Sequence, residues 1–305
     1  MQHIELTSLG SHLGRLPHNP RVIVSGNFAT PYPVLAELDR HLAEYRLHML
    51  NAHGPIPDRS GVTYETKPDG GDGWMQYFIR KGWDTYVSDA VERGRSGFAS
   101  PDVWTSEPTF LPYADPFERF RIGEGEGSWN DDPSKRKVLP GNQFPVEAYD
   151  NYMRQSVPRW LSTDKAIIDA YLALVDKVCP CVLLVHSQGG AFGFKVAEQR
   201  PDKVKGIVAI ESATAGIVAN APKLKDTPVL KIFGDYVDQH PRWATFKKID
   251  TEYANAIKAA GGTVDWINLP EIGIKGNSHM MMQDRNSDQI AEVIQKWLVS
   301  KGLSD

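Results

Sequence analysis

Apolar, β-branched runs alternate along most of the chain with segments whose apolar residues recur at helical spacing. The runs predict strands at residues 3–9, 21–26, 47–54, 83–90, 181–187, 204–212, 228–235 and 263–271. The periodic segments predict helices at residues 33–45, 71–82, 164–178, 189–201, 244–260 and 288–302. Strands that alternate with helices are typical of βαβ units, so the sequence predicts an α/β protein with a mostly parallel central sheet flanked by helices.

The alternation stops between residues 98 and 160, where no period is sustained. This segment holds 11 of the 30 aromatic residues and 8 of the 21 prolines. Flexible linkers are poor in aromatic residues, so we expect a packed insertion that forms a cap or lid over a pocket. An insertion that only covers apolar surface is the alternative. The predicted organisation is a core made of residues 1–97 and 161–305, interrupted by a cap at 98–160.

The composition is that of a soluble globular protein, with 41% hydrophobic and 24% charged residues in a chain of 305. The net charge of −4 gives no sign of a nucleic-acid-binding surface. No apolar run approaches the roughly 20 residues that a membrane span needs. The N-terminus shows no signal peptide, which predicts a cytoplasmic protein as numbered, or a secreted or periplasmic one if a signal was removed. The oligomeric state stays open, a homodimer included.

The two cysteines, Cys179 and Cys181, are separated by one residue. A disulfide at this spacing would be strained, so we expect free, partly buried thiols at the start of a strand. Two cysteines are too few for a structural zinc site, and histidines and acids do not group at the short spacing of a metal cluster. The sequence therefore predicts neither a metal nor a cofactor.

The most informative strand ends in "VHSQGG", where Ser187 lies between a histidine and a glycine pair. A serine on a sharp strand-to-helix turn exposes its Oγ and places the next N–H, that of Gln188, at a helix N-terminus. Gly189 and Gly190 give the room that such a turn needs, whereas Val185 replaces the first glycine of the usual G-x-S-x-G pattern. We predict that Ser187 is a nucleophile; a serine that caps the following helix is the alternative.

A serine nucleophile needs a base, and the base needs a carboxylate that orients it. His279 is the predicted base, because it lies in a polar, glycine-containing loop between the last strand and the last helix. His186 points to the opposite face of its strand from the serine, so we expect a supporting role. Three acids are candidates for the carboxylate that orients this base. Glu211 ends the strand after the serine turn, whereas Asp235 and Asp238 follow the next strand, where spacing alone favours them.

The oxyanion hole for such a nucleophile is predicted to use the N–H of Gln188 and a second N–H from the loop "AHGPIPDRSG". The residue after the His53–Gly54 turn often supplies this donor. Here that residue is Pro55, which has no N–H. Gly54 or Ile56 is therefore the predicted donor, and without one of them the hole is incomplete.

Seven segments together resemble a known family: "HG", "TKPDGGDGWMQYFIRKGWDTYVSD", "ERGRSG", "NQFPVEAYDNYM", "VHSQGG", "VAIES" and "GIKGNSHMMMQDRNS". Over about residues 50 to 300 the chain resembles the esterase 713-like branch of the α/β-hydrolase superfamily. Members carry Val-His-Ser-Gln directly before the first glycine of the strand-to-helix turn, which accounts for Val185. They take the acid, a Glu, from the strand that follows the helix after this turn. The resemblance therefore implies an α/β-hydrolase fold and a triad of Ser187, His279 and Glu211, with Asp235 and Asp238 as alternatives.

The sequence thus predicts a serine hydrolase that cleaves carboxylic esters through an acyl-enzyme. The aromatic insertion favours a small-molecule ester with an apolar or aromatic part. The same triad could act on amides, lactones or C–C bonds next to a carbonyl, an alternative that the altered His-Gly-Pro loop motivates. A catalytically silent ligand-binding protein on a hydrolase scaffold is a further alternative, because a fold does not fix a function.

Overall fold

The computed structural model describes residues 46–51, 58–59, 61–96, 104, 106–213 and 216–304. The strands predicted at 3–9 and 21–26 and the helix predicted at 33–45 lie outside these residues. The described strands are β1 (Arg46–Asn51), β2 (Asp58–Arg59), β3 (Asp84–Asp89), β4 (Ser156–Val157), β5 (Cys181–His186), β6 (Val204–Ile210), β7 (Val229–Phe233) and β8 (Val264–Asn268). The α-helices are α2 (Val62–Glu65), α3 (Trp74–Arg80), α4 (Ala114–Arg119), α5 (Tyr149–Arg154), α6 (Asp164–Val178), α7 (Gln188–Gln199), α8 (Pro241–Ala259) and α9 (Ser287–Ser300).

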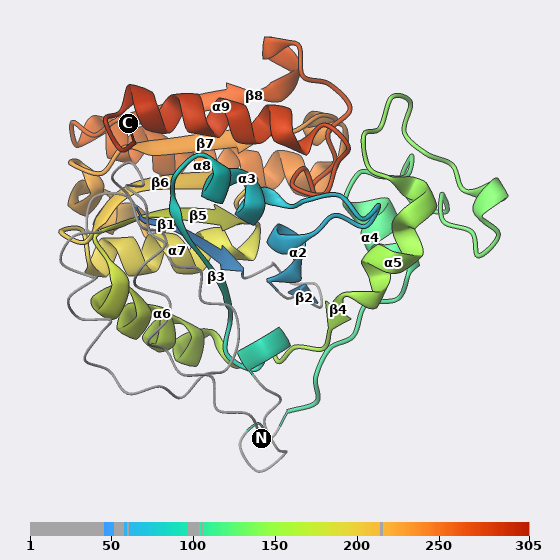
Figure 1. The fold of residues 1–305 in the computed structure, drawn as a ribbon, viewed down its shortest axis with the longest axis horizontal. Helices are drawn as coiled ribbons and strands as arrows, with labels where there is room; N and C mark the ends of the chain where they lie inside the picture. The colour runs from blue at the N-terminus through green and yellow to red at the C-terminus, as the bar shows by residue number, and fades with distance from the viewer. Residues whose placement is uncertain are drawn as a thin grey trace, which may run out of the picture. The chain divides into compact units, whose positions relative to one another are not determined.

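Six of the strands form one sheet in the order β3-β1-β5-β6-β7-β8 (Figure 1). Every neighbouring pair within this sheet runs parallel. The short strands β2 and β4 pair with each other in a separate antiparallel ladder. The predicted α/β class, a parallel central sheet flanked by helices, is confirmed.

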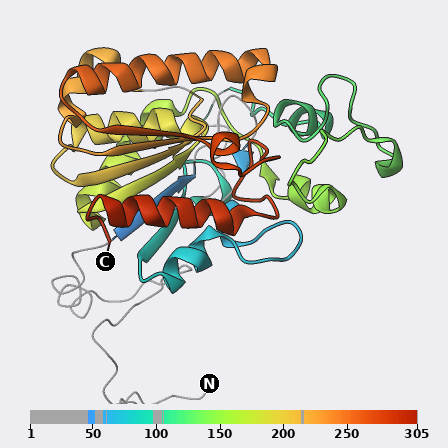
Figure 2. The same ribbon diagram turned by 90° about the horizontal axis from the view of Figure 1, so that it is seen from above.

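The sheet is covered on both faces, which explains why β5 is apolar from Cys181 to Val185 rather than alternating between apolar and polar residues. In β5, Val182 and Leu184 pack in one apolar cluster with residues of α3 and α9. Leu183 and Val185, which alternate with them, pack in a second cluster with residues of α6, α7 and α8. Figure 2 shows α8, in orange, and α9, in red, on opposite sides of the strands.

The order of the strands places a topological switch point between β1 and β5. The chain continues from β1 to β3 on one side, whereas β5 lies on the other side of β1 and is followed outward by β6, β7 and β8. In open parallel sheets, ligands bind outside the carboxyl ends of the strands at such a point. Ser187 is the first residue after β5, so it lies where this fold builds its sites.

The described part of the inserted segment has an aromatic interior of its own. The buried rings of Phe117, Phe144, Tyr149 and Tyr152 form a continuous set of contacts, and Phe117 meets Tyr149 edge to face at 5.2 Å. The segment is therefore packed, as its aromatic content predicts. Figures 1 and 2 both place α4 and α5 beyond one end of the sheet. That the segment acts as a cap stays a prediction.

Two details differ from the sequence-based expectations. Cys179 and Cys181 are joined by a disulfide rather than free. Their Cα atoms lie 4.5 Å apart, inside the range that a disulfide spans. Helix α8 begins at Pro241, three residues earlier than predicted, because proline fits the first helical position and the ring of His240 accepts the N–H of Arg242. In the part of the chain that the structure describes, every helix is too short or too polar to cross a membrane.

Candidate active site

Ser187 occupies the sharp turn that the sequence predicts. Its backbone has φ 54° and ψ −124°, a conformation that a side chain disfavours, and α7 begins at the next residue. The Ser187 N–H donates to the Ile210 carbonyl at 3.1 Å, and the Ser187 carbonyl accepts from Ala213 N–H at 2.9 Å. Strained conformations persist only where the surroundings hold them, and they cluster at functional sites. Here the neighbouring strand β6 and the residues after it hold the turn.

Two glycines of α7 explain how the turn tolerates Val185. A Cβ on Gly190 would lie 2.6 Å from the Cβ of Ser212, so the helix approaches the end of β6 through this glycine. A Cβ on Gly193 would lie 2.5 Å from Val185 Cγ1. The space that the first glycine of the pattern normally leaves on the strand is therefore supplied by Gly193 on the helix, one turn further along.

His279 and Glu211 meet although 68 positions separate them in the chain. The Nδ1 atom of His279 lies 2.6 Å from Glu211 Oε2. The second oxygen, Oε1, accepts the backbone N–H of Gly234 at 2.8 Å and Nη2 of Arg121 at 2.5 Å. Both Glu211 and His279 are fully buried. Glu211 also has a positive φ of 39° directly after β6, so the carboxylate stands on a second strained turn.

Electrostatics keeps this carboxylate charged. Burial acts to raise the pKa of Glu211, but Arg121 and His279 together outweigh burial and lower the pKa to about 2. A carboxylate can only accept hydrogen bonds, so the proton of the contact lies on His279 Nδ1. The Nε2 atom of a neutral His279 then carries a lone pair, which is what a general base needs.

The two aspartates that spacing favours are engaged elsewhere. The carboxylate of Asp235 accepts the backbone N–H groups of Tyr236, at 2.8 Å, and Gly276, at 2.9 Å. Asp238 is exposed and pairs with Lys247 at 2.9 Å. The structure therefore brings Glu211, rather than either aspartate, to His279.

The imidazole of His279 is enclosed by rings from three parts of the chain. The ring centroid of Trp243 lies 3.9 Å away, that of His186 4.3 Å and that of Phe120 4.9 Å. His186 Nε2 donates to the backbone carbonyl of His279 at 2.9 Å. Burial lowers the pKa of His186 well below its usual value, so this ring is neutral. His186 thus joins the end of β5, beside Ser187, to the His279 loop; its supporting role stays a prediction.

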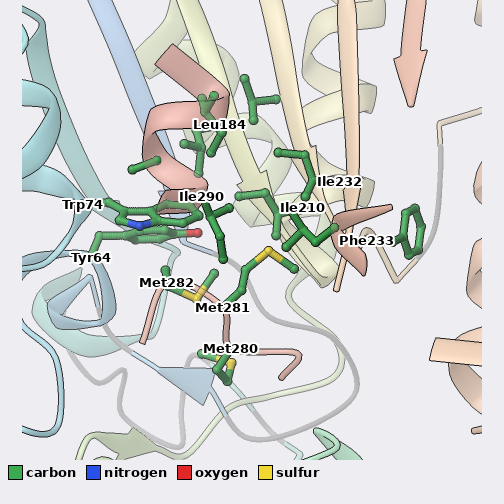
Figure 3. Close-up of a cluster of buried hydrophobic side chains, with 14 of the residues drawn as sticks. Tyr64, Trp74, Leu184, Ile210, Ile232, Phe233, Met280, Met281, Met282 and Ile290 are labelled. Atoms are coloured by element: carbon green, nitrogen blue, oxygen red, sulfur yellow. The ribbon is translucent and has the colours of Figure 1, made fainter. Parts of the chain in front are cut away.

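The loop that carries His279 is fixed by a buried carboxylate behind it. Asp284 accepts the backbone N–H of Ser278 at 2.9 Å, its hydroxyl at 2.7 Å and the Asn277 side chain at 3.0 Å. Burial raises the pKa of Asp284 to about 7. After His279 come three fully buried methionines, Met280 to Met282. Figure 3 shows them in an apolar cluster with Trp74 and Ile290, which anchors the loop to the core.

Three buried arginines near these residues were not predicted from the sequence. Arg121 contacts Glu211, while Arg159 and Arg93 reach Gln188 Oε1 through Nη1, at 3.0 and 3.4 Å. Arg93 belongs to the "ERGRSG" motif, but its link to the serine turn spans 95 positions. No local spacing rule signals contacts of this length.

The predicted oxyanion hole is described in part. Gln188 is the first residue of α7, where N–H groups have no partner within the helix. Gly54 and Ile56, together with His53 and Pro55, lie outside the described residues. Among the residues that the structure does describe, no group of three or more His, Cys, Asp or Glu side chains could hold a metal ion.

Comparison with known proteins finds an esterase and a lipase among the relatives of this chain. No family model matches the chain. A solved structure of a novel bacterial esterase is 33% identical, with a TM-score of 0.75; the match covers 86% of this chain and 83% of the esterase. A probable secreted lipase, phiG, from Fungal sp. (strain ATCC 74256) is 26% identical over 294 residues, 79% of each chain. The sheet and these relatives define an α/β-hydrolase. The chain belongs to the esterase 713-like branch of that superfamily, as its motifs predict.

Proposed function

We propose that this protein, a carboxylic ester hydrolase by family, cleaves its substrates with a triad of Ser187, His279 and Glu211. The observation that carries the proposal is the contact of 2.6 Å between His279 Nδ1 and Glu211 Oε2. It supplies a base with a defined tautomer and a charged group that stabilises the imidazolium. The strained turn at Ser187, next to the residue that contacts the His279 backbone, supports the choice of nucleophile.

The reaction would follow the two-step scheme of serine hydrolases. Ser187 Oγ attacks the ester carbonyl while His279 Nε2 takes its proton. The N–H of Gln188 and a donor from residues 54–56 hold the oxyanion. The imidazolium then protonates the leaving alcohol. In the second step His279 takes a proton from water, which attacks the acyl-enzyme carbonyl, and then returns the proton to Ser187 Oγ as the acid leaves. Glu211 stays ionised throughout, as its lowered pKa requires.

We further propose that residues 98–160 cap a core formed by residues 1–97 and 161–305. The aromatic interior of the segment supports this, since it gives the insertion a fixed shape beyond the end of the sheet. The same aromatic content favours an ester with an apolar or aromatic part.

A fluorophosphonate probe tests the nucleophile, because it phosphonylates an activated serine. We expect a single adduct by intact mass on the wild type, mapped to Ser187, and no adduct on Ser187→Ala. Ser134→Ala, which removes an exposed hydroxyl of the insertion, should label like the wild type. An adduct that persists in Ser187→Ala, or a wild type that takes up no probe, would sink the proposal.

A panel of p-nitrophenyl esters with short, long and aromatic acyl groups tests the bond that is cleaved. We expect turnover that rises from acetate towards longer or aromatic acyl groups. Negligible turnover of every ester, with Ser187 still labelled by the probe, would instead favour amides, lactones or C–C bonds next to a carbonyl.

A further inference from the structure

Arg121 connects the inserted segment to the acid of the proposed triad. Its side chain is 2% exposed. Nη2 donates to Glu211 Oε1 at 2.5 Å, Nε donates to the Asp235 carbonyl at 2.8 Å, and the guanidinium lies 5.1 Å from the centre of the Trp243 ring. The backbone of Arg121 is in the left-handed region, with φ 60°. A bulky residue is held there only when its surroundings fix it, and the contacts of the guanidinium with Glu211, Asp235 and Trp243 belong to those surroundings.

The preceding residue, Phe120, contacts the base. Its carbonyl accepts the backbone N–H of His279 at 2.9 Å, and its ring packs on the imidazole. Two consecutive residues of the insertion therefore touch the two members of the pair, one through the backbone and one through a charge. A segment that only covered the core would not need a buried cation at this point.

We propose that Arg121 is a positioning residue for the reaction, acting through Glu211 to orient the carboxylate and to set the pH at which the Glu211–His279 pair takes up a proton. The inference rests on the proposed function, since it assigns a role within that site. Glu211 attracts a proton to the pair, and a cation bonded to its other oxygen opposes this attraction. Because the two groups are coupled, the effect belongs to the pair rather than to either residue.

Other titratable groups surround the pair and remain in every variant. His186 is neutral and buried against His279. Asp235 and Asp284, both acceptors of backbone N–H groups, approach from the loops after β7 and β8. At His240, beside the start of α8, burial and the charges of Arg121, Arg242 and Arg119 lower the pKa of the imidazole. Among the contacts of the described residues, the guanidinium hydrogen bond to Glu211 comes from Arg121, so the Arg121 variants remove this contact and leave the other groups in place.

A cavity of about 280 Å³ beside Arg121 makes a direct test feasible. Arg121 and His240 line it together with three acids, Glu118, Glu124 and Glu126. An acidic lining attracts small cations. Shortening Arg121 would extend this cavity towards Glu211, so that a guanidinium ion from solution could take the place of the lost group.

The first experiment compares the pH dependence of kcat/KM for the wild type, Arg121→Met, Arg121→Lys and the control Arg136→Met. Arg136 is a second arginine of the insertion, with a side chain 4% exposed, but it pairs with Asp150 and stacks on Trp129. We expect the acid limb of Arg121→Met to move to higher pH by about one unit. Arg121→Lys and Arg136→Met should stay near the wild type. An Arg121→Met profile that superimposes on the wild type would overturn the inference.

The second experiment is chemical rescue of Arg121→Gly, in which glycine also suits the positive φ. We expect kcat/KM at neutral pH to fall by about 10- to 100-fold. Guanidinium at a non-denaturing concentration should restore part of this loss. Urea, which has the same shape without the charge, should restore none. Equal rescue by both, or by neither, contradicts a charge-based role, and Arg121→Ala, which also removes the guanidinium and most of the side chain, serves in place of the glycine variant if that variant does not fold.

Failure of the proposed function would look different from failure of this inference. The fluorophosphonate reaction of the wild type tests the proposed triad alone. The experiments on the Arg121 variants instead compare the kcat/KM of each variant with that of the wild type. The NMR resonance of the His279 Nδ1 proton, followed against pH in wild type and Arg121→Met, needs no turnover. An identical titration in the two proteins would refute the role of Arg121 even if the chain cleaved no ester.

Discussion

The serine turn and the His279–Glu211 pair are held in place by different means. At the turn, backbone hydrogen bonds from Ser187 to β6 combine with two glycines that let α7 approach the sheet. At the pair, charges and hydrogen bonds converge from the insertion, from the end of β6 and from the loop after β8. The proposed nucleophile, Ser187, is thus positioned by close backbone packing, and the proposed base, His279, by a buried polar network.

This difference teaches that the two halves of the site should fail in opposite ways. The turn has almost no spare volume, so it is sensitive to an added methyl group. The polar network depends on complete partners, so it is sensitive to a lost charge or hydrogen bond. Variants that add atoms near the serine turn, and variants that remove charge at the His279–Glu211 pair, can therefore test the two regions separately.

The largest effect is expected from Glu211→Gln. The change keeps the size of the side chain but removes the charge and allows the wrong imidazole tautomer, which in a serine protease triad lowers kcat by about 10⁴-fold. We expect a loss of that order in kcat for p-nitrophenyl esters and an equally slowed reaction with the fluorophosphonate.

Thermal unfolding of the Glu211→Gln variant is the control, because the fully buried Glu211 also pairs with Arg121. A folded variant within tenfold of the wild-type kcat would remove Glu211 from the triad. In that case the comparison between a packed turn and a charged pair would no longer describe the active site.

The next largest effect is expected from adding a methyl group at the turn with Gly193→Ala. Alanine gains about 1 kcal/mol in helix propensity over glycine. Its Cβ, however, would lie 2.5 Å from Cγ1 of the fully buried Val185. Overpacking costs about 1–3 kcal/mol, and a β-branched side chain cannot rotate away cheaply. We therefore expect a net loss in the free energy of unfolding, measured by urea denaturation.

The double variant Val185→Ala with Gly193→Ala sharpens this prediction. Removing the Val185 methyl groups vacates the space that the new methyl needs, so the double variant should lose less than the sum of the single losses. We expect a coupling of at least about 0.5 kcal/mol. Strict additivity would show that Gly193 does not compensate for the missing glycine of the strand.

The turn could be predicted from sequence because its signals are local. A buried strand, a serine and two glycines within ten residues specify it, and the sheet follows from the same periodicity. Glu211 could be chosen over Asp235 and Asp238 only through the family resemblance, since all three follow strands. Arg121 lies 90 positions from Glu211, and no pattern along one chain encodes a pairing of that length. The prediction that Cys179 and Cys181 are free thiols was wrong, because spacing alone could not show how close the two Cα atoms lie.

A smaller, pH-dependent effect is expected at Asp284, behind the His279 loop. Burial raises the pKa of Asp284 from 3.8 to about 7 in the folded chain. Between about pH 4 and pH 7 the folded chain therefore holds a proton that the unfolded chain has lost. Stability falls as pH rises through this window, by up to about 1.4 kcal/mol per pH unit.

Asp284→Asn should flatten this dependence. The amide oxygen can accept the N–H groups of the Asn277 side chain and the Ser278 backbone, as Oδ2 of Asp284 does. Its NH2 group can donate to the Ser278 hydroxyl oxygen, which replaces the contact in which that hydroxyl donates to Oδ1. We expect urea denaturation of the variant to show a shallower slope between about pH 4 and pH 7 than the wild type. A slope equal to that of the wild type would mean that the charge at Asp284 is not disfavoured by folding.

The smallest effect is expected from Asp238→Asn, at the acid that spacing favours together with Asp235. The side chain of Asp238 is 74% exposed and pairs with Lys247 on the surface, and such pairs contribute about 0–1 kcal/mol. We expect kcat to stay within about twofold of the wild type, in contrast to the loss from Glu211→Gln. If Asp238→Asn instead lost activity to a comparable degree, the acid would lie in the arrangement that chain spacing predicts, and the Arg121–Glu211 contact would have to be structural.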